Sequence, residues 1–448
     1  MLRGGNSRLG FYYDFFFEPA INPEYLPQIE ERYRALVMAD LPVAHATMMK
    51  QNAQEMYRHF GQEIRADLFE EERAQFVEMF KCGEFFDAAP LPYVASTREL
   101  SAYKLLSLKI ITQVIGGEEI QVTRIEGVAA FDKQALKQEV RLAGEAKARD
   151  HMQLGLQQQL FARHPYLAPG TFLWLPKGAQ LREGLLDWWR TVHLAAGFQT
   201  VHTPLLLEEQ AGKLGQTISQ LDSLEVGGSY YHLVQSMAPQ HAMIFQAKLR
   251  RAGELPYKIC EYREIFTGIA DHELEGLCQT RTICRDQATV FCTPEQVVDG
   301  LISSLQFIAG TIRIFDLKCK WALYSATSLK AGKTADWKRS VEWFHKALHA
   351  NKMDFVESQT QQELHSPFLE VVYSDALGRE WPGPRIEIFL QLPSRMRLVY
   401  EAKQGQHTPI MISWSLFGSL ERFIALLIEH HAGILPEWMT KKKIPESL

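Results

Sequence analysis

Residues 279–292 (QTRTICRDQATVFC) combine side chains suited to chemistry with the alternation of a β-strand. Counting by twos gives the strand one polar face, made of Gln279, Arg281, Ile283, Arg285, Gln287, Thr289 and Phe291. Guanidinium groups on such a face bind carboxylates and phosphates through charge-assisted hydrogen bonds. The pattern fits two interpretations, because the same face would serve as the floor of an active site or as a solvated polar surface.

Three cysteines lie on or beside this strand and share its opposite face, since their numbers are even: Cys278, Cys284 and Cys292. They allow either a metal site or thiols packed inside a sheet, and packing is the interpretation we favour. The chain has six cysteines, and no two of them form a CxxC pair. This usage predicts reduced intracellular thiols rather than a disulfide framework.

The composition is that of a globular protein, with 46% hydrophobic and 23% charged residues, and 448 residues predict about two or three domains. A net charge of -5 does not favour broad nucleic-acid binding, so contact with tRNA or another RNA would need a local basic patch. The lysines at 441–443 would supply one, although such runs are usually solvated tails. We see neither a secretory signal nor an apolar run long enough for a membrane span, and we expect a cytoplasmic protein, with an organelle as the alternative.

The elements that would position these residues form an α+β pattern. Residues 132–162 are rich in helix formers and predict a connecting helix over 131–164. Strands and amphipathic helices then follow one another over 165–438, which predicts an α+β domain with antiparallel connections. The other segments are a mixed region over 1–130 and a polar tail over 439–448.

Three segments, in this order, resemble the signature motifs of class II aminoacyl-tRNA synthetases: GFQTVHTPLL, YREIF and GSLERF. The segments RDHMQLGLQQQLF, GPRIEI and LPSR make the chain similar to threonyl-tRNA synthetase over nearly its whole length. The resemblance implies an antiparallel sheet of six or seven strands over 165–438 and a partial editing-domain-like region over 1–130. It also implies a homodimer built around the first motif, or a heterodimer with an authentic synthetase.

Two arginines match phosphate-binding positions of that family. Arg263 stands where the family neutralises the α-phosphate of ATP, and Arg422 stands where it binds the outer phosphates. ATP with magnesium is therefore a candidate ligand, and bidentate arginine–phosphate contacts are strong. The alternative is that both arginines pair with carboxylates such as Glu264 and Glu421.

Other positions of the resembled ATP and amino-acid pocket carry different residues. On the strand, Gln279 stands where the family has an arginine, and Ile283 stands where it has an aromatic residue that supports the adenine. Arg285 stands at a glutamine position of the family, and Gln287 stands at an aspartate position. The family has a glutamate two residues after the second-motif arginine, and this chain has Ile265 at that position. Glu264 is one residue away, so its side chain would lie on the opposite face of a strand. A stretch of about eighteen residues between GPRIEI and LPSR is missing, within 383–395, and with it one wall of the pocket.

The three positions of the family's zinc ligands are Ala238, Thr289 and Ser413. In the family this zinc recognises threonine through its amine and hydroxyl groups. Alanine has no donor atom, and neutral hydroxyls are poor zinc ligands beside thiolate and imidazole. We therefore expect no zinc here and no other confident cofactor.

The editing half has also changed. Of the family's Asp-x-Cys-x-x-Pro-His pattern, Asp87 and Pro92 are kept, while Ala89 and Tyr93 stand at the cysteine and histidine positions. The family's anticodon-binding domain would begin where this chain ends, so we expect it to be absent.

Several further residues carry two readings. Trp188 and Trp189 suit a dimer interface or a helix buried in its own domain. His151 and His241 have family counterparts, but a lone histidine is usually a satisfied structural group.

Three hypotheses on function follow. The leading one is a truncated, degenerate paralogue that has lost threonylation and editing and has a binding, regulatory or structural role. The second is an enzyme that forms an adenylate on another carboxylate, with Arg263 and Arg422. The third is an active threonine–tRNA ligase.

Overall fold

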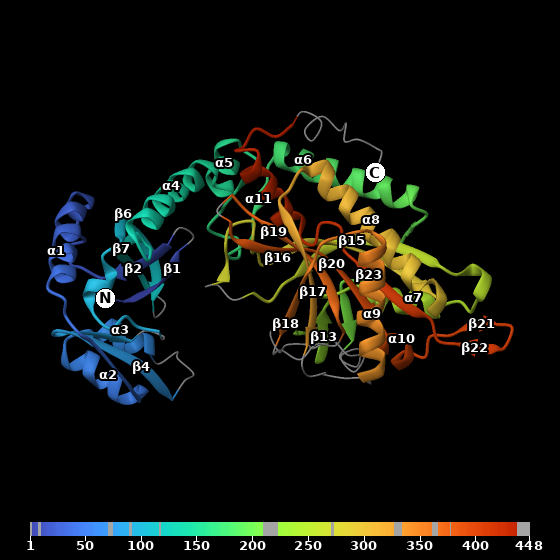
Figure 1. Cartoon of the computed structure of the whole chain (residues 1–448), viewed down its shortest axis with the longest axis horizontal. Helices are drawn as coiled ribbons and strands as arrows, with labels where there is room; N and C mark the ends of the chain where they lie inside the picture. Colours follow the sequence, from blue (N-terminus) through green and yellow to red (C-terminus); the bar gives the residue numbers. More distant parts are fainter. Residues whose placement is uncertain are drawn as a thin grey trace. The chain divides into compact units, whose positions relative to one another are not determined.

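The computed structural model describes residues 2–7, 10–69, 75–88, 92–115, 118–208, 223–269, 273–326, 334–360, 366–376 and 378–436. The chain divides into two compact units, Met1–Ala148 and Arg149–Leu448 (Figure 1). Helices and antiparallel sheets occur in both units, which confirms the α+β class.

The first unit contains two antiparallel sheets. The larger has the order β1-β2-β7-β6 and the smaller the order β3-β4-β5. Their strands are β1 (Arg3–Ser7), β2 (Gly10–Phe15), β7 (Glu118–Ala129), β6 (Tyr103–Ile115), β3 (Val43–Met49), β4 (Phe76–Cys82) and β5 (Phe85–Ala88). The helices that accompany them are α1 (Leu26–Met38), α2 (Lys50–His59), α3 (Glu63–Leu68) and α4 (Lys133–Arg149).

A large sheet organises the second unit. Among the described residues it has eight strands in the order β10-β15-β16-β23-β20-β19-β17-β18. The strands are β10 (Gln199–Thr200), β15 (Tyr257–Phe266), β16 (Thr282–Cys292), β23 (Ile410–Trp414), β20 (Glu380–Phe389), β19 (Phe368–Ser374), β17 (Cys319–Ala326) and β18 (Val356–Thr360). Six of the described strands, from β15 to β17 in this order, pair antiparallel, which agrees with the resemblance, and β10 and β18 each add a parallel strand at one edge.

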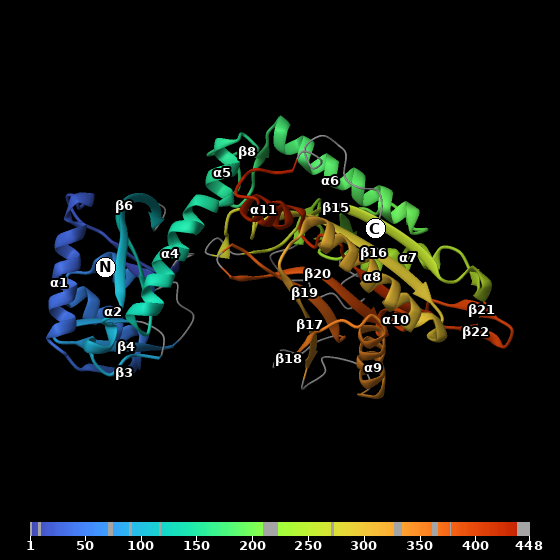
Figure 2. The ribbon, with the colours of Figure 1, turned by 45° about the horizontal axis from the view of Figure 1, so that its top comes forward.

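The two faces of this sheet have different coverings. Alternation along β16 sends Cys284 and Cys292 into the main apolar core, which α8 and α11 help to form against β16 (Figure 2). The cysteines are free and buried there, which confirms the packing interpretation. The opposite face packs a smaller core around Phe291 and carries the polar residues of β16. The helices of this unit are α5 (His151–Gln157), α6 (Pro176–Ala195), α7 (Ala238–Gln246), α8 (Val297–Phe315), α9 (Thr334–Ala350), α10 (Gln391–Arg395) and α11 (Leu420–His430).

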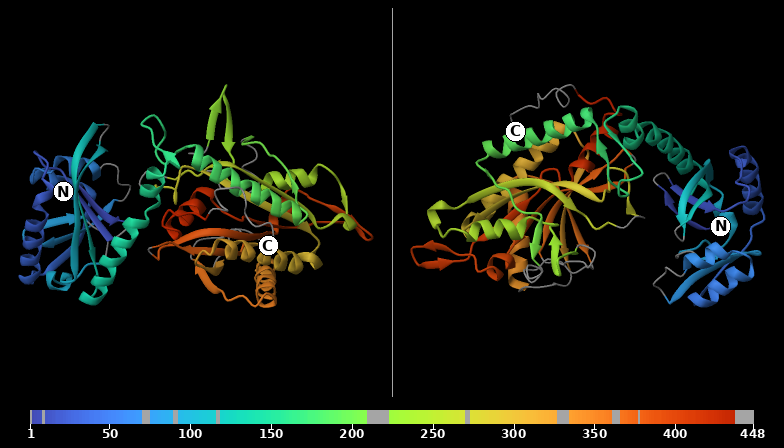
Figure 3. Two further views of the ribbon diagram at one scale, coloured as in Figure 1. Left: turned by 90° about the horizontal axis from the view of Figure 1, so that it is seen from above. Right: turned by 180° about the vertical axis from the view of Figure 1, so that it is seen from behind.

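Smaller sheets complete the second unit. One of them, with the order β11-β13-β12, projects from the large sheet (Figure 3). The strands of the small sheets are β11 (Leu206–Glu208), β13 (Ser229–Leu233), β12 (Ser223–Val226), β14 (Arg250–Arg251), β21 (Tyr400–Ala402), β22 (Gly405–His407), β8 (Phe161–Ala162) and β9 (Leu173–Trp174).

The helix expected over 131–164 is two helices, α4 and α5. The break falls at Asp150, whose carboxylate accepts a hydrogen bond from the backbone N–H of Met152 at 2.8 Å. An aspartate in this N-cap position starts a new helix, since it satisfies an N–H that lacks a partner in the first turn. Helix propensity alone does not reveal such a break.

Helix α6 carries both tryptophans of the first motif. It begins with Pro176 in its first turn and ends before Gly197, whose φ of 81° suits glycine. Trp188 and Trp189 are 4% and 0% exposed and belong to the main core. The reading as a helix buried in its own domain is therefore the correct one, and neither ring lies on a free surface.

Helix α8 lies in a segment that is long and apolar enough to span a membrane, although no such segment is expected from the sequence. This segment is Pro294–Phe315. Its buried face belongs to the main core, through residues such as Leu301, Leu305 and Ile308. The core helix of a globular domain has these same properties.

The connection after GPRIEI is short in the fold. Strand β20 ends at Phe389 and α10 begins at Gln391, with Leu390 alone between them. A further central strand has no room in that connection.

Burial of His193 on α6 predicts acid sensitivity. Its Nδ1 lies 2.8 Å from the carbonyl oxygen of Trp189, and burial lowers its pKa to about 4. The unfolded chain then binds a proton at higher pH than the folded chain, so stability is complete above the unfolded pKa and falls with pH toward about 4. Between about pH 7 and about pH 4.5 this histidine should cost roughly 2 kcal/mol.

Urea unfolding of the native chain and of His193→Phe at both pH values measures this cost. The variant should lose about 2 kcal/mol less than the native chain over that interval. Equal losses in the two proteins would show that His193 does not titrate as its burial implies.

Candidate functional site

The polar face of β16 continues onto β15 as a pair of arginines. Arg263 and Arg285 are partners in the antiparallel register, so their side chains stand directly opposite each other on one face. Like charges in this position are destabilising unless another group lies between them. The next pair along the face is Ile265 with Ile283, which offers two aliphatic side chains where the resemblance implies a glutamate and an adenine-supporting aromatic.

Arg263 is held at one end only. Its terminal nitrogen Nη1 donates to the hydroxyl of Thr203 at 3.1 Å and to the carbonyl oxygen of Pro204 at 2.7 Å. Its Nε is buried and has no hydrogen-bond partner. It does not pair with Glu264, so that alternative is wrong, and part of its guanidinium remains available to a ligand.

Arg285 makes no hydrogen bond or ion pair with the described residues. Burial lowers its pKa, and the like charge of Arg385 lowers it further. A guanidinium stays protonated despite such a shift. The face therefore contains a partly buried positive charge that forms no direct ion pair with the described residues, although attraction to the carboxylates of Asp286, Glu387 and Glu370 offsets part of these two effects.

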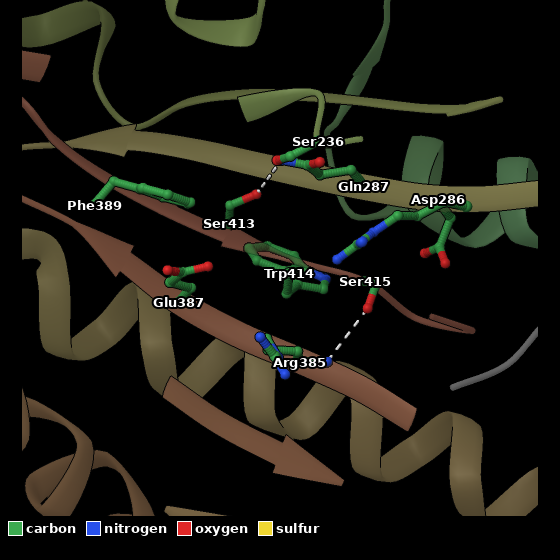
Figure 4. Close-up of a pocket in the computed structure, with 10 residues that line it drawn as sticks. Ser236, Asp286, Gln287, Arg385, Glu387, Phe389, Ser413, Trp414 and Ser415 are labelled. Atoms are coloured by element: carbon green, nitrogen blue, oxygen red, sulfur yellow. Dashed lines mark hydrogen bonds between the residues drawn. The ribbon is translucent and has the colours of Figure 1, made fainter. Parts of the chain in front are cut away.

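An open pocket lies beside Arg285, between β16, β20 and β23 (Figure 4). Its lining is mainly polar: Ser236, Arg285, Asp286, Gln287, Arg385, Glu387, Phe389, Ser413, Trp414 and Ser415. The sequence reasoning missed Arg385 and Glu387, although GPRIEIF places both on one face of a strand. In this pocket Arg385 pairs with Glu370 at 2.9 Å, and Glu387 accepts a hydrogen bond from Ser366 at 2.6 Å.

The former zinc positions form a closed hydrogen-bond network. The hydroxyls of Thr289 and Ser413 are 3.1 Å apart, and Gln287 donates to Ser413 at 2.8 Å. Nδ1 of His241 lies 2.7 Å from the Thr289 hydroxyl, and its Nε2 lies 3.2 Å from Glu261. The third position, Ala238, begins α7 one turn before His241 and has no donor.

Glu261 holds the far end of this network. Burial opposes its ionisation, but hydrogen bonds from His241 and Thr203 outweigh burial and lower its pKa. The carboxylate accepts a hydrogen bond from the imidazole, and the other ring nitrogen shares a hydrogen bond with the hydroxyl of Thr289. His241 is a satisfied structural group, as expected.

The donor set does not fit zinc. Two hydroxyls already engaged in hydrogen bonds and an alanine replace the thiolate and imidazoles that this metal prefers. Throughout the residues that the structure describes, no cluster of three or more histidine, cysteine, aspartate or glutamate side chains is placed to hold a metal ion.

Arg422 donates hydrogen bonds to the backbone and forms no ion pair with its neighbour Glu421. Its acceptors are the carbonyl oxygens of Cys278 at 2.7 Å and Pro382 at 2.8 Å. Instead, Glu421 and Glu264 both pair with Arg182. Burial alone would lower the pKa of Arg182, but attraction to these carboxylates outweighs burial and raises it.

The remaining sequence-based positions lie elsewhere. Gln279 is not on β16 but in the turn before it, where its N–H donates to the carbonyl oxygen of Glu275 at 3.2 Å. The alternation therefore begins three residues later than the pattern suggested. His151 is a satisfied structural group, with Nδ1 2.6 Å from Glu429 and Nε2 accepting from the N–H of Leu277 at 3.0 Å.

The former editing positions belong to the first unit. Tyr93 packs against His45 and Phe80, with ring centroids 5.7 Å away in each case. Ala89 lies outside the described residues. Asp87 is buried and accepts hydrogen bonds from Tyr57 and Arg65 at 2.6 and 3.1 Å, which suits a structural carboxylate.

Comparison with known proteins places this site in a family. The model for the "tRNA synthetase class II core domain (G, H, P, S and T)" matches residues 228–431. Threonine–tRNA ligase of Maridesulfovibrio salexigens is 30% identical over 442 residues, which cover 98% of this chain and 69% of that protein. The chain belongs to the threonyl-tRNA synthetase family. The threonine–tRNA ligase of Nitrosococcus oceani is also 30% identical, with 97% of this chain and 69% of that protein covered.

Solved structures agree with the family. The RNA binding domain of threonyl-tRNA synthetase from Cryptosporidium parvum Iowa II has a TM-score of 0.62 at 26% identity, and the match covers 65% of this chain and 74% of that one. Prolyl-tRNA synthetase of Giardia lamblia, with a TM-score of 0.53 at 14% identity, covers 67% of this chain and 56% of that one and shares the fold. As a threonyl-tRNA synthetase relative, this chain keeps the class II sheet.

Proposed function

We propose that this chain is a pseudo-synthetase: it keeps the class II core as a binding module and does not activate threonine. Loss of editing belongs to the same proposal, as does a regulatory or structural role. The observation that carries it is the network of Gln287, Ser413, Thr289 and His241 at the positions of the family's zinc ligands.

The network argues against threonine for an energetic reason. A pocket that selects threonine over valine must reward the hydroxyl with a bond that valine cannot make. Here the hydroxyls of Thr289 and Ser413 already have partners within the protein. Binding threonine through them would break existing hydrogen bonds, so little selectivity remains.

Metal analysis of the purified chain tests this proposal. We expect far less than one zinc per chain after purification without chelators, because the donor set is poor. An authentic threonyl-tRNA synthetase purified in the same way is the positive control. About one tightly held zinc per chain in this protein would contradict the proposal.

A second candidate is an adenylate-forming ligase for another carboxylate, and the unpaired Arg263 and Arg285 favour it. A carboxylate oxygen of the substrate would attack the α-phosphorus of ATP, the bond to the bridging oxygen would break, and pyrophosphate would leave. Arg263 would stabilise the charge on the α-phosphate. Pyrophosphate exchange that requires an amino acid other than threonine, and that Arg263→Gln abolishes, would favour this candidate over the first.

Ligands and partners belong to the proposal as well. ATP with magnesium remains a candidate at Arg263 and Arg422, and tRNA or another RNA a candidate partner. Pairing through the first-motif region, with a second copy or an authentic synthetase, would use surfaces other than the buried Trp188 and Trp189. A cytoplasmic location stays a prediction.

A further inference from the structure

We propose that the pocket between β16, β20 and β23 binds an α-amino acid with a negatively charged side chain. This inference rests on the proposed function, since it takes the pocket to have lost threonine. Arg263 and Arg285 would bind the two acidic groups of the ligand, and Glu387 would bind its ammonium group.

The two arginines set the charge of the site. They are register partners on adjacent strands, so their Cβ atoms are about 5 Å apart on one face. No ion pair neutralises either of them among the described residues. Repulsion from Arg385, together with the burial of Arg285, is a cost that a bound anion would relieve.

Both arginines have hydrogen-bond donors to spare. Arg263 donates to Thr203 and Pro204 through Nη1 alone, and its buried Nε has no acceptor. Arg285 donates to no described group. The planar fork of a guanidinium matches the two oxygens of a carboxylate or phosphate, so each arginine is suited to one acidic group.

Glu387 adds a negative charge to the same pocket. Its Oε1 accepts from Ser366 at 2.6 Å, while Oε2 receives no hydrogen bond from the described residues. The neighbouring charge on Arg385 is already neutralised by Glu370. Arg285 and Glu387 line the pocket, and Arg263 lies beside Arg285 on the neighbouring strand. Two guanidinium groups and one carboxylate at this place would complement two negative charges and one positive charge.

Discrimination between ligands supports the same class of ligand. Threonine has one carboxylate, so it would leave the partly buried Arg285 without an ion pair. A site with such a polar group discriminates strongly against ligands that cannot pair with it.

Isothermal titration calorimetry of the full chain tests the inference. The probes are L-aspartate, L-glutamate and O-phospho-L-serine, which separate a carboxylate from a phosphate side chain, with L-asparagine, L-glutamine and L-serine as their neutral counterparts. We expect one of the acidic amino acids to bind at least about tenfold more tightly than its neutral counterpart. Arg285→Gln should reduce this preference to about threefold or less, and Arg285→Lys should keep part of it, since lysine retains the charge but not the fork.

Arg281→Gln is the matched control, because it removes the same charge from the segment that leads into β16, and Arg281 does not line the pocket. It should leave the acidic preference intact, and circular dichroism should show all variants folded. Equal binding of acidic and neutral amino acids, no binding of any acidic one, or an unchanged preference in Arg285→Gln would overturn the inference. Zinc-dependent binding of threonine would instead overturn the proposed function, so the two failures are distinguishable.

Discussion

Replacing Asp286 with alanine is expected to lower the free energy of unfolding of the second unit by roughly 3–5 kcal/mol. Asp286 lies on β16, on the face opposite the pocket arginines, and is 3% exposed. Its carboxylate accepts hydrogen bonds from the backbone N–H groups of Leu416, Phe417 and Gly418 at 2.5 to 3.2 Å. It also accepts a hydrogen bond, at 2.9 Å, from the indole N–H of Trp189 on α6. Alanine would leave four buried donors without acceptors.

The contacts of Asp286 also tie the fold to the site. They fix the turn before α11, where Gly418 has a φ of 75° and a Cβ would come within 2.9 Å of the carbonyl oxygen of Gly383. That turn sets the start of the helix that carries Arg422. Asp187→Ala, which removes an exposed carboxylate from α6, is the control and should change stability by less than about 1 kcal/mol. Urea unfolding that separates the two variants by less than this amount would contradict the structural role assigned to Asp286.

The triple variant Ala238→Cys, Thr289→His and Ser413→His is expected to bind one zinc per chain. Thr289 and Ser413 are register partners with hydroxyls 3.1 Å apart, and Ala238 begins the helix that contacts Thr289 through His241. Thiolate and two imidazoles are the ligands that zinc prefers, with an open position for water. We expect the zinc affinity to exceed that of the native chain by at least about 1,000-fold.

The triple variant should bind zinc but should not activate threonine. Arg285 would still occupy the pocket face, and β20 would still run into α10 without an additional strand. The control variant Ala238→Ser, Thr289→Asn and Ser413→Asn has polar groups of moderate size and no strong zinc ligand, and atomic absorption should find no metal in it. Zinc in the control, or none in the cysteine–histidine variant once circular dichroism shows it folded, would mean that the three positions do not converge.

Much of the fold was predictable because it depends on local patterns. The alternation of β16 correctly separates Arg285, Gln287 and Thr289 from the buried Cys284 and Cys292. The order of the motifs correctly indicated the class II core, and the family is confirmed by relatives of 30% identity. Such features survive in a single sequence because the side-chain period of a strand is fixed by its geometry.

The rest depends on groups that meet only in three dimensions. Asp150 splits the predicted long helix, and Gln279 falls in a turn, because local hydrogen bonds override propensity and periodicity. The partners of Arg182 come from a distant strand and a distant helix, and Glu370 meets Arg385 through the register of two neighbouring strands, which no spacing in the sequence reveals. Whether a hydroxyl is free or already paired, as for Ser413, is likewise a property of the packed sheet.

Threonine-dependent exchange of labelled pyrophosphate into ATP tests most directly whether this chain has lost threonine activation. With saturating ATP, magnesium, threonine and added zinc, we predict a rate no higher than the background without amino acid. That would be less than about one thousandth of the rate of an authentic synthetase assayed alongside. Threonine-stimulated exchange that disappears when zinc is chelated would contradict the loss of activity, and with it the role assigned to the network at Thr289 and Ser413.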